Sequence, residues 1–104
     1  MTNDKQIAQA IYDKYHEFYD GETQGCCAVI AMEITKTIDG VAVAGYIDYY
    51  RGERSHWWVE KDGQIYDPMT EYYFSKDPHR HVEVHRDQAE FLKVYNNYKQ
   101  YEII

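Results

Sequence analysis

The sequence predicts one α+β domain with two N-terminal helices, a small antiparallel sheet and a C-terminal helix. Three observations predict this class. The chain has 104 residues, a length that fits one domain spanning residues 1–104. Apolar residues recur at helical spacing up to Ile38 and again after Asp87. Between them lie runs of β-branched and aromatic residues joined by short turns, as expected for strands of an antiparallel sheet.

Two helices are predicted before the sheet. The first covers about Asp4–Tyr19, with Gly21 following its end. The second begins after Gly25 and ends before Asp39-Gly40, so both cysteines fall in its first turn. Apolar residues at steps of three and four predict that this second helix is buried, and they are Cys27, Ile30, Ala31, Ile34 and Ile38.

The middle of the chain predicts strands. Val41–Tyr50 is rich in β-branched and aromatic residues and is expected to be a central strand. Gly45 within it indicates a close approach of another backbone or a bulge. Arg51–Arg54 is expected to be a polar turn. A hairpin then follows, because Lys61-Asp62-Gly63 separates two β-type runs and Asp-Gly is a strong hairpin signal.

The last third of the chain predicts a further strand and a helix. Asp67-Pro68 is expected to end the hairpin, and Glu71–Phe74 is a short apolar piece without a predicted type. His81–His85 alternates like a strand. Asp87, with a glutamate three residues later, forms a capping box that starts the final helix.

A two-residue hairpin loop makes a specific prediction about His56 and Asp67. With Asp62-Gly63 as the loop, Glu60 pairs with Ile65 and Trp58 lies opposite Asp67. Residues that are two apart on a strand share a face, so His56 and Asp67 become diagonal neighbours within reach of one hydrogen bond. A three-residue loop would turn Asp67 to the other face.

The position of the cysteines suggests nucleophilic chemistry. At a helix N-terminus, the backbone N–H groups and the helix dipole favour a thiolate, and the same N–H groups can hold an oxyanion. A cysteine enzyme also needs a histidine base and a group that orients the histidine. Cys27, His56 and Asp67 are therefore candidate catalytic residues. A buried structural cysteine is the competing interpretation of Cys27 alone.

Four motifs in one order, within residues 24–70, are similar to those of transglutaminase-like proteins, a part of the papain-like cysteine enzymes. The matching segments are Gly25-Cys26-Cys27-Ala28-Val29-Ile30-Ala31, Val43-Ala44-Gly45-Tyr46, His56-Trp57-Trp58-Val59-Glu60 and Asp67-Pro68-Met69-Thr70. This resemblance implies a nucleophile at Cys27, a base at His56 and an orienting carboxylate at Asp67. It implies acyl transfer from an amide, through a thioester, to water or an amine, with no cofactor and no metal.

The chain departs from that family in several ways. It is short for the family, and no tryptophan precedes the cysteine to complete an oxyanion hole. Gln24 is a candidate oxyanion donor instead, although it lies closer to the cysteine than the corresponding glutamine of papain-like enzymes. Cys26 is an alternative reactive thiol. Trp57 and Trp58 alternate faces, and we expect one to be core and Trp58 to be a candidate wall of the cleft.

His81, Glu83 and His85 alternate on the predicted strand and would share one face. Two histidines and a glutamate can bind zinc. We favour a solvated face of an edge strand, because no second pair of ligands lies close in sequence.

Charge and composition exclude several classes of function. The formal net charge of −7 argues against direct binding of nucleic acid or of an anionic membrane, both of which require clustered basic residues. No apolar run approaches the length of a membrane span, and the N-terminus does not resemble a signal peptide. Adjacent cysteines cannot form a disulfide framework, so we expect a cytoplasmic protein.

Two functions follow from these observations. The first is a small cysteine-dependent acyl enzyme that acts on a peptide or protein amide. The alternative is a non-catalytic acidic binding or inhibitor protein on the same fold, which would engage a basic protein partner.

Overall fold

The computed structural model describes residues 3–18, 26–74 and 76–102. These residues form four helices and one four-stranded antiparallel sheet, so the predicted α+β class is confirmed. In chain order the elements are α1 (Asp4–Phe18), α2 (Cys26–Ile38), β1 (Val41–Tyr49), β2 (Gly52–Lys61), β3 (Gln64–Tyr66), α3 (Pro68–Phe74), β4 (His79–His85) and α4 (Gln88–Glu102).

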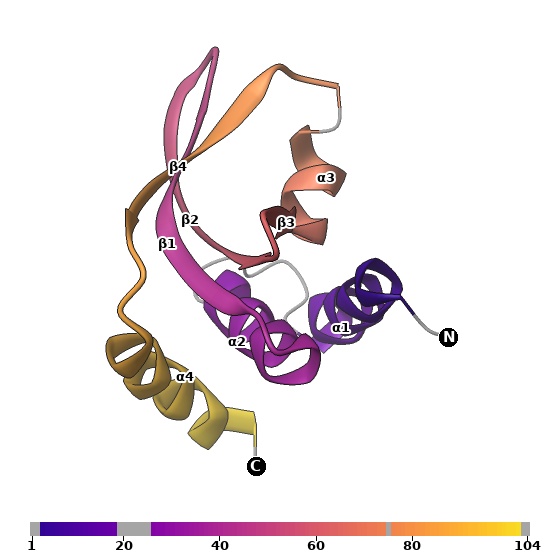
Figure 1. Cartoon of the computed structure of the whole chain (residues 1–104), viewed down its shortest axis with the longest axis vertical. Coiled ribbons are helices and arrows are strands. Elements are labelled where there is room, and N and C mark those ends of the chain that lie inside the picture. The colour runs from indigo at the N-terminus through magenta and orange to yellow at the C-terminus, as the bar shows by residue number, and fades with distance from the viewer. Residues whose placement is uncertain (1–2, 19–25, 75, 103–104) are drawn as a thin grey trace.

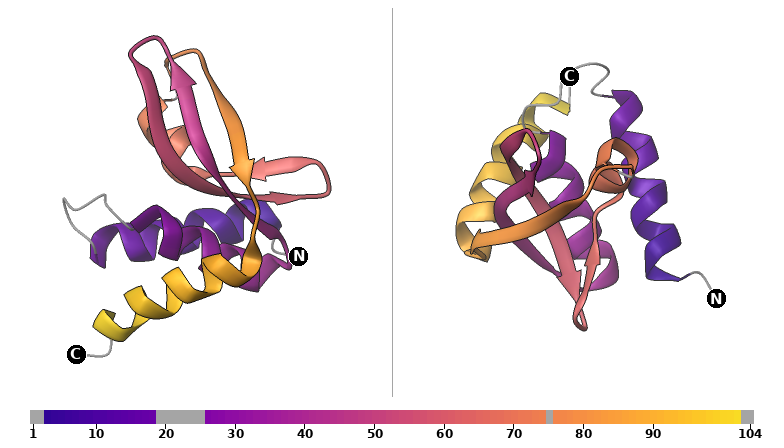
Figure 2. Two further views of the ribbon diagram at one scale, coloured as in Figure 1. Left: turned by 90° about the vertical axis from the view of Figure 1, so that its left-hand side faces the viewer. Right: turned by 90° about the horizontal axis from the view of Figure 1, so that it is seen from above.

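The helices α1, α2 and α4 lie side by side at one end of the molecule, with α2 in the middle (Figures 1 and 2). The twisted sheet rises from this helical layer, and α3 lies beside the sheet on its concave side (Figure 1). The core is formed where α2 meets the other helices and the sheet. Its most deeply buried members include Val29, Ile34, Ala42, Val59 and Phe91.

The two N-terminal helices form where the apolar spacing predicts them. In α1 the buried face consists of Ala8, Tyr12 and Tyr15, each at most 6% exposed. In α2 the predicted stripe is confirmed for Ile30, Ala31, Ile34 and Ile38, which are all buried. The side chain of Cys27, its fifth predicted member, lies outside the described part of the structure. Because α2 contacts α1, α4 and the sheet, it is covered on several sides and is the central helix of the layer.

The strands pair in the order β3-β2-β1-β4, so β1 is central as predicted. Gly45 marks a register shift between β1 and β4. A Cβ atom at Gly45 would lie 1.9 Å from the carbonyl oxygen of Val82, so only glycine allows the two backbones to approach this closely. The prediction of a close approach or a bulge at Gly45 is confirmed.

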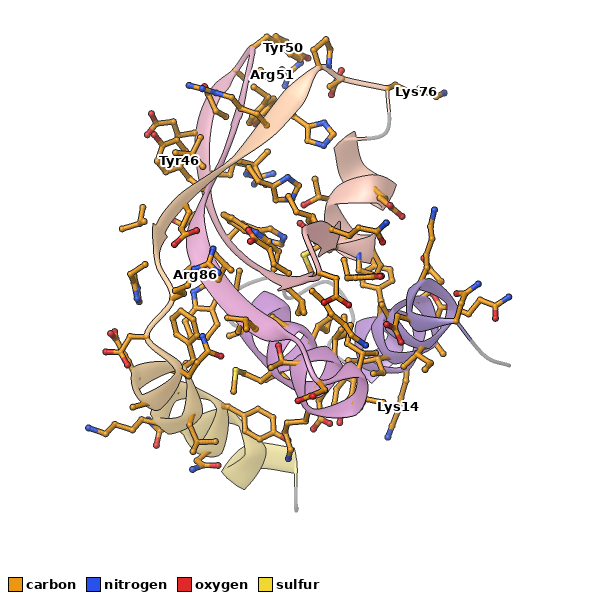
Figure 3. All side chains as sticks on the ribbon, in the orientation of Figure 1. Lys14, Tyr46, Tyr50, Arg51, Lys76 and Arg86 are labelled. Atoms are coloured by element: carbon orange, nitrogen blue, oxygen red, sulfur yellow. The ribbon has the colours of Figure 1, made fainter. Side chains whose placement is uncertain are left out.

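The connection between β1 and β2 is tighter than predicted. The turn comprises only Tyr50 and Arg51, and Gly52–Arg54, expected to lie in a polar turn, belongs to β2. Gly52 has a φ of 120°, a conformation that favours glycine and lets the strands reverse within two residues. Tyr50 and Arg51 therefore lie at the far tip of the hairpin, away from the helical layer (Figure 3).

Helix α3 is a difference from the prediction, in which Asp67-Pro68 only ends the hairpin. Asp67 is in fact the N-cap of α3: its Oδ1 accepts a hydrogen bond from the backbone N–H of Thr70 at 3.2 Å. Pro68 is the first helical residue, a position where proline is favoured. The same two residues therefore end the hairpin and start a helix.

The final helix has the predicted cap. Oδ1 of Asp87 accepts hydrogen bonds from the backbone N–H groups of Ala89 and Glu90, at 3.1 and 3.2 Å. Phe91 and Tyr95 attach α4 to the core, whereas Leu92 is 48% exposed. Among the described helices, none has the length and apolar character needed to cross a membrane.

Candidate active site

His56 and Asp67 form a buried hydrogen-bonded pair. Nε2 of His56 lies 2.9 Å from Oδ1 and 2.8 Å from Oδ2 of Asp67. Each residue is only 7% exposed. The pair therefore sits inside the protein, where water competes little for its hydrogen bonds.

The hairpin register explains how these two residues meet. Lys61 pairs with Gln64, Glu60 with Ile65 and Val59 with Tyr66, as the two-residue loop predicts. Asp62 and Gly63 both have positive φ, as this tight loop requires. Asp67 follows the last paired residue and points back to His56 from the start of α3.

The Asp67 carboxylate has more donors than the sequence indicated. Besides His56, Oδ2 accepts hydrogen bonds from Oγ1 of Thr70 at 2.5 Å and from Nε2 of His81 at 2.7 Å. Burial alone would raise the pKa of Asp67. The hydrogen bonds from His56, His81 and Thr70, together with the charge of His56, outweigh burial and hold that pKa well below its usual range. Asp67 is therefore a carboxylate that only accepts hydrogen bonds.

The prediction that His81, Glu83 and His85 share one solvated face is wrong. Glu83 pairs with Gly45 and His85 with Ala44, so the bulge at Val84 moves His85 to the other face of the sheet. His85 packs its ring 5.1 Å from that of Phe91. The side chain of His81 is only 14% exposed and contacts Asp67.

The bulge also separates the residues considered for zinc. Within the part of the chain that the structure describes, no group of three or more His, Cys, Asp or Glu side chains is arranged to hold a metal ion. His81 thus belongs to the Asp67 cluster rather than to a histidine-rich strand face.

The two tryptophans lie on opposite faces of β2. Trp58 is 1% exposed and lies on the face of His56, with ring centroids 6.3 Å apart and an interplanar angle of 22°. Trp57 lies on the other face and packs against Phe91 of α4, with ring centroids 4.4 Å apart. Trp58 is therefore buried beside His56, and it also lines a small cavity that adjoins the His56–Asp67 pair. Its role as a wall of a substrate cleft stays a prediction.

A cavity of about 10 Å³ adjoins the pair, and Ile30 and Ala31 of α2 line it together with His56 and Asp67. This volume is about that of one water molecule. Ile30 and Ala31 lie about one turn after the two cysteines with which α2 begins.

The cysteines themselves stand in the first turn of α2, as predicted, since this helix begins at Cys26. The side chains of Cys26 and Cys27 lie outside the described part of the structure, as does Gln24. The structure therefore brings His56 and Asp67 together, and it brings α2 against them. The roles of Cys26, Cys27 and Gln24 stay predictions.

A larger groove of about 740 Å³ lies on the other side of the segment that carries Asp67, between α1 and β3. Its polar lining includes Lys5, Gln9, Gln64 and Glu71. Among the described residues that line it there is no histidine, serine or cysteine. Asp67 borders both hollows, and the imidazole of His56 lines the smaller one.

Sequence reasoning missed Thr70 and His81. Thr70 could have been found, because Asp-Pro is typical of a helix start, where the N-cap aspartate accepts the N–H of the residue three positions later. His81 could not, since its contact with Asp67 depends on which edge of β1 that strand joins and in which register.

No family model, no curated protein and no solved structure matches the chain. The likeness to transglutaminase-like proteins stays a resemblance of motifs, and the function rests on the geometry of the chain's own residues.

Proposed function

We propose that the protein is a small cysteine-dependent acyl enzyme in which Cys27 is the nucleophile, His56 the base and Asp67 the group that orients His56. The observation that carries this proposal is the buried hydrogen bond between Nε2 of His56 and Asp67, beside a small cavity that residues of α2 also line. An ionised, buried carboxylate fixes an imidazole in one tautomer, and a helix start favours a thiolate.

The reaction follows from the orientation of the imidazole. Asp67 accepts a hydrogen bond from the Nε2–H group of His56 and stays ionised, so Nδ1 is the nitrogen that takes the proton of the Cys27 thiol. The sulfur then forms a bond to the carbonyl carbon of an amide. Nδ1 returns its proton to the amine as the carbon–nitrogen bond breaks, which leaves a thioester. Water or a second amine then attacks the thioester carbon and gives a proton to Nδ1. The carbon–sulfur bond breaks, the acyl product leaves, and Nδ1 returns the proton to the sulfur of Cys27.

Backbone N–H groups at the start of α2 are the proposed oxyanion donors. The first N–H groups of a helix have no partner within the helix, and they can bind the oxygen on which negative charge develops. Gln24 is proposed as an additional donor. A peptide or protein amide is the proposed substrate class.

One observation favours the alternative function, an acidic binding protein without catalysis. The cavity beside His56 and Asp67 holds about 10 Å³, too little for a substrate carbonyl together with its substituents. A closed His–Asp pair of this kind also occurs as a purely structural element. In that case the surface of this chain, with its net charge of −7, would dock on a basic protein.

Acylation by a p-nitrophenyl ester distinguishes the two functions. We expect the wild type to release p-nitrophenolate in a burst and to gain the mass of one acyl group on Cys27. Cys26→Ser should behave like the wild type, whereas Cys27→Ser should lose both the burst and the adduct. His56→Ala should slow acylation by roughly 10²-fold or more, the contribution typical of a general base.

Two results would contradict the proposal. An adduct on Cys26 that is retained in Cys27→Ser would overturn the role of Cys27 and make Cys26 the reactive thiol. A burst rate that does not change in His56→Ala would exclude the enzyme and leave the binding protein as the function to pursue.

A further inference from the structure

We propose that His81 is a positioning residue of this site, because it holds the Asp67 carboxylate in the orientation that fixes His56 as an Nε2–H tautomer. This inference rests on the proposed function, and it adds a residue that neither the motifs nor the predicted triad contains. His81 reaches the site from β4, far along the chain from both partners.

The contacts converge on a single oxygen. Oδ2 of Asp67 lies 2.7 Å from Nε2 of His81 and 2.8 Å from Nε2 of His56. The side chain of His81 is 14% exposed, and its ring lies edge-on to Trp58 with centroids 4.8 Å apart. Trp58 in turn lies beside the ring of His56. One tryptophan therefore packs against both imidazoles, and one carboxylate oxygen joins them.

The charge of Asp67 decides which hydrogens lie in these contacts. An ionised carboxylate has no proton to donate, so each imidazole must supply a hydrogen from Nε2. A ring nitrogen lone pair at this distance from a carboxylate oxygen would be repelled. His56 is thereby held with Nε2 protonated, which leaves Nδ1 as the nitrogen that acts as base.

His81 adds a contact from a third element. Thr70 holds both carboxylate oxygens from the start of α3, through its N–H to Oδ1 and its hydroxyl group to Oδ2. His56 reaches both oxygens from β2, and His81 holds Oδ2 from β4. The torsion of a carboxylate about its bond to Cβ is broad, so a donor from a separate element narrows the orientations that the carboxylate can take. Without His81, Oδ2 loses this donor, and the orientation of the carboxylate towards His56 is less restricted.

The fold places His81 there through the close approach at Gly45. His81 pairs with Ile47 of β1, and His56 pairs with Gly45, so both imidazoles project from the same face of the sheet. The backbone of β4 comes near enough because Gly45 has no side chain. The ring of His79, 6.0 Å from that of His81, is the next titratable group on this face.

Two matched variants separate hydrogen bonding from packing. His81→Gln keeps an N–H donor near the position of Nε2, whereas His81→Phe keeps an aromatic ring against Trp58 and removes the donor. We expect His81→Phe to slow alkylation of Cys27 by iodoacetamide at pH 6 by about tenfold, the size of effect seen when outer hydrogen bonds of metal sites are removed. His81→Gln should restore the rate to within about threefold of the wild type, on the same scale.

The second readout is the tautomer of His56, measured from the ¹⁵N signals of its imidazole. In the wild type we expect a protonated Nε2 on both His56 and His81. In His81→Phe we expect His56 to populate the Nδ1–H form as well, and in His81→Gln we expect the wild-type form. This measurement does not depend on the thiol.

The outcomes are distinct. Alkylation that is equally slow in the wild type and in His56→Ala contradicts the proposed function, and the His56 tautomer then decides the role of His81. A wild-type alkylation rate or an unchanged His56 tautomer in His81→Phe shows that His81 only packs against Trp58. If His81→Phe does not fold, an unprotonated Nε2 on wild-type His81 overturns the inference.

Discussion

At the scale of single residues, Asp67 is the residue on which the others depend. One buried carboxylate caps α3, accepts a hydrogen bond from the hydroxyl group of Thr70 and joins the imidazoles of His56 and His81. A buried carboxylate is costly unless its oxygens are satisfied, and here each oxygen accepts at least two hydrogen bonds. The residue that orients the candidate base is thus also a structural junction of three elements.

The low pKa of Asp67 predicts how stability depends on pH. A carboxyl group whose pKa is lowered by folding stabilises the native state above its unfolded pKa of about 3.9, and the stability is lost as the pH falls from there towards the folded value. We expect Asp67→Asn to lower the free energy of unfolding at pH 7 by about 3 kcal/mol. The difference from the wild type should shrink below about pH 4. Chemical denaturation across pH 2–7 measures both.

The control is Asp48→Asn, which removes a more exposed ion pair with Arg80. It should change the free energy of unfolding by less than about 1 kcal/mol. Unfolding curves of the wild type and Asp67→Asn that stay parallel from pH 7 to pH 2 would contradict the hydrogen-bonding account of Asp67.

At the scale of elements, the close contact between β1 and β4 positions the site. Gly45 lets β4 approach, and the register shift beside it places His81 on the face of His56 and His85 on the face of Phe91. The bulge therefore divides the histidines of β4 between a candidate active site and the packing of α4.

Gly45→Ala should disrupt this contact. Its Cβ atom would lie 1.9 Å from the carbonyl oxygen of Val82, which is part of the backbone and cannot rotate away. We expect a loss of about 3 kcal/mol or more in the free energy of unfolding, at the upper end of overpacking effects. Ser55→Ala, at an exposed position of the same sheet, should change stability by less than about 0.5 kcal/mol. Equal melting temperatures of the two variants would contradict the close approach.

Neighbouring residues of α4 test how that helix is attached. Phe91 is fully buried, whereas Leu92 is 48% exposed. Truncation of a buried phenylalanine typically costs about 3–5 kcal/mol, so Phe91→Ala should be strongly destabilising. Leu92→Ala should cost less than about 1 kcal/mol, because little apolar area is lost from the core. Thermal unfolding of the pair measures the difference, and similar losses would mean that α4 packs through another face.

At the scale of the whole molecule, local signals predicted most helices and strands and the His56–Asp67 pair of the site. Periodicity located α1 and α2, and the Asp62-Gly63 loop set the register that joins His56 to Asp67. Two features were not predicted, because they depend on information that no local pattern carries. Asp67-Pro68 has two roles, as the end of the hairpin and as the start of α3. The division of His81 and His85 between two faces of the sheet depends on a bulge at the point where β4 meets Gly45.

The central claim is that the buried His56–Asp67 pair activates Cys27, and the alkylation rate of the thiol as a function of pH tests it most directly. We predict that iodoacetamide reacts rapidly with the wild type and with Cys26→Ser below pH 7. Cys27→Ser should lose this reaction, and His56→Ala should slow it. A slow reaction that follows an ordinary thiol pKa of about 8.5 and is the same in His56→Ala would contradict the claim.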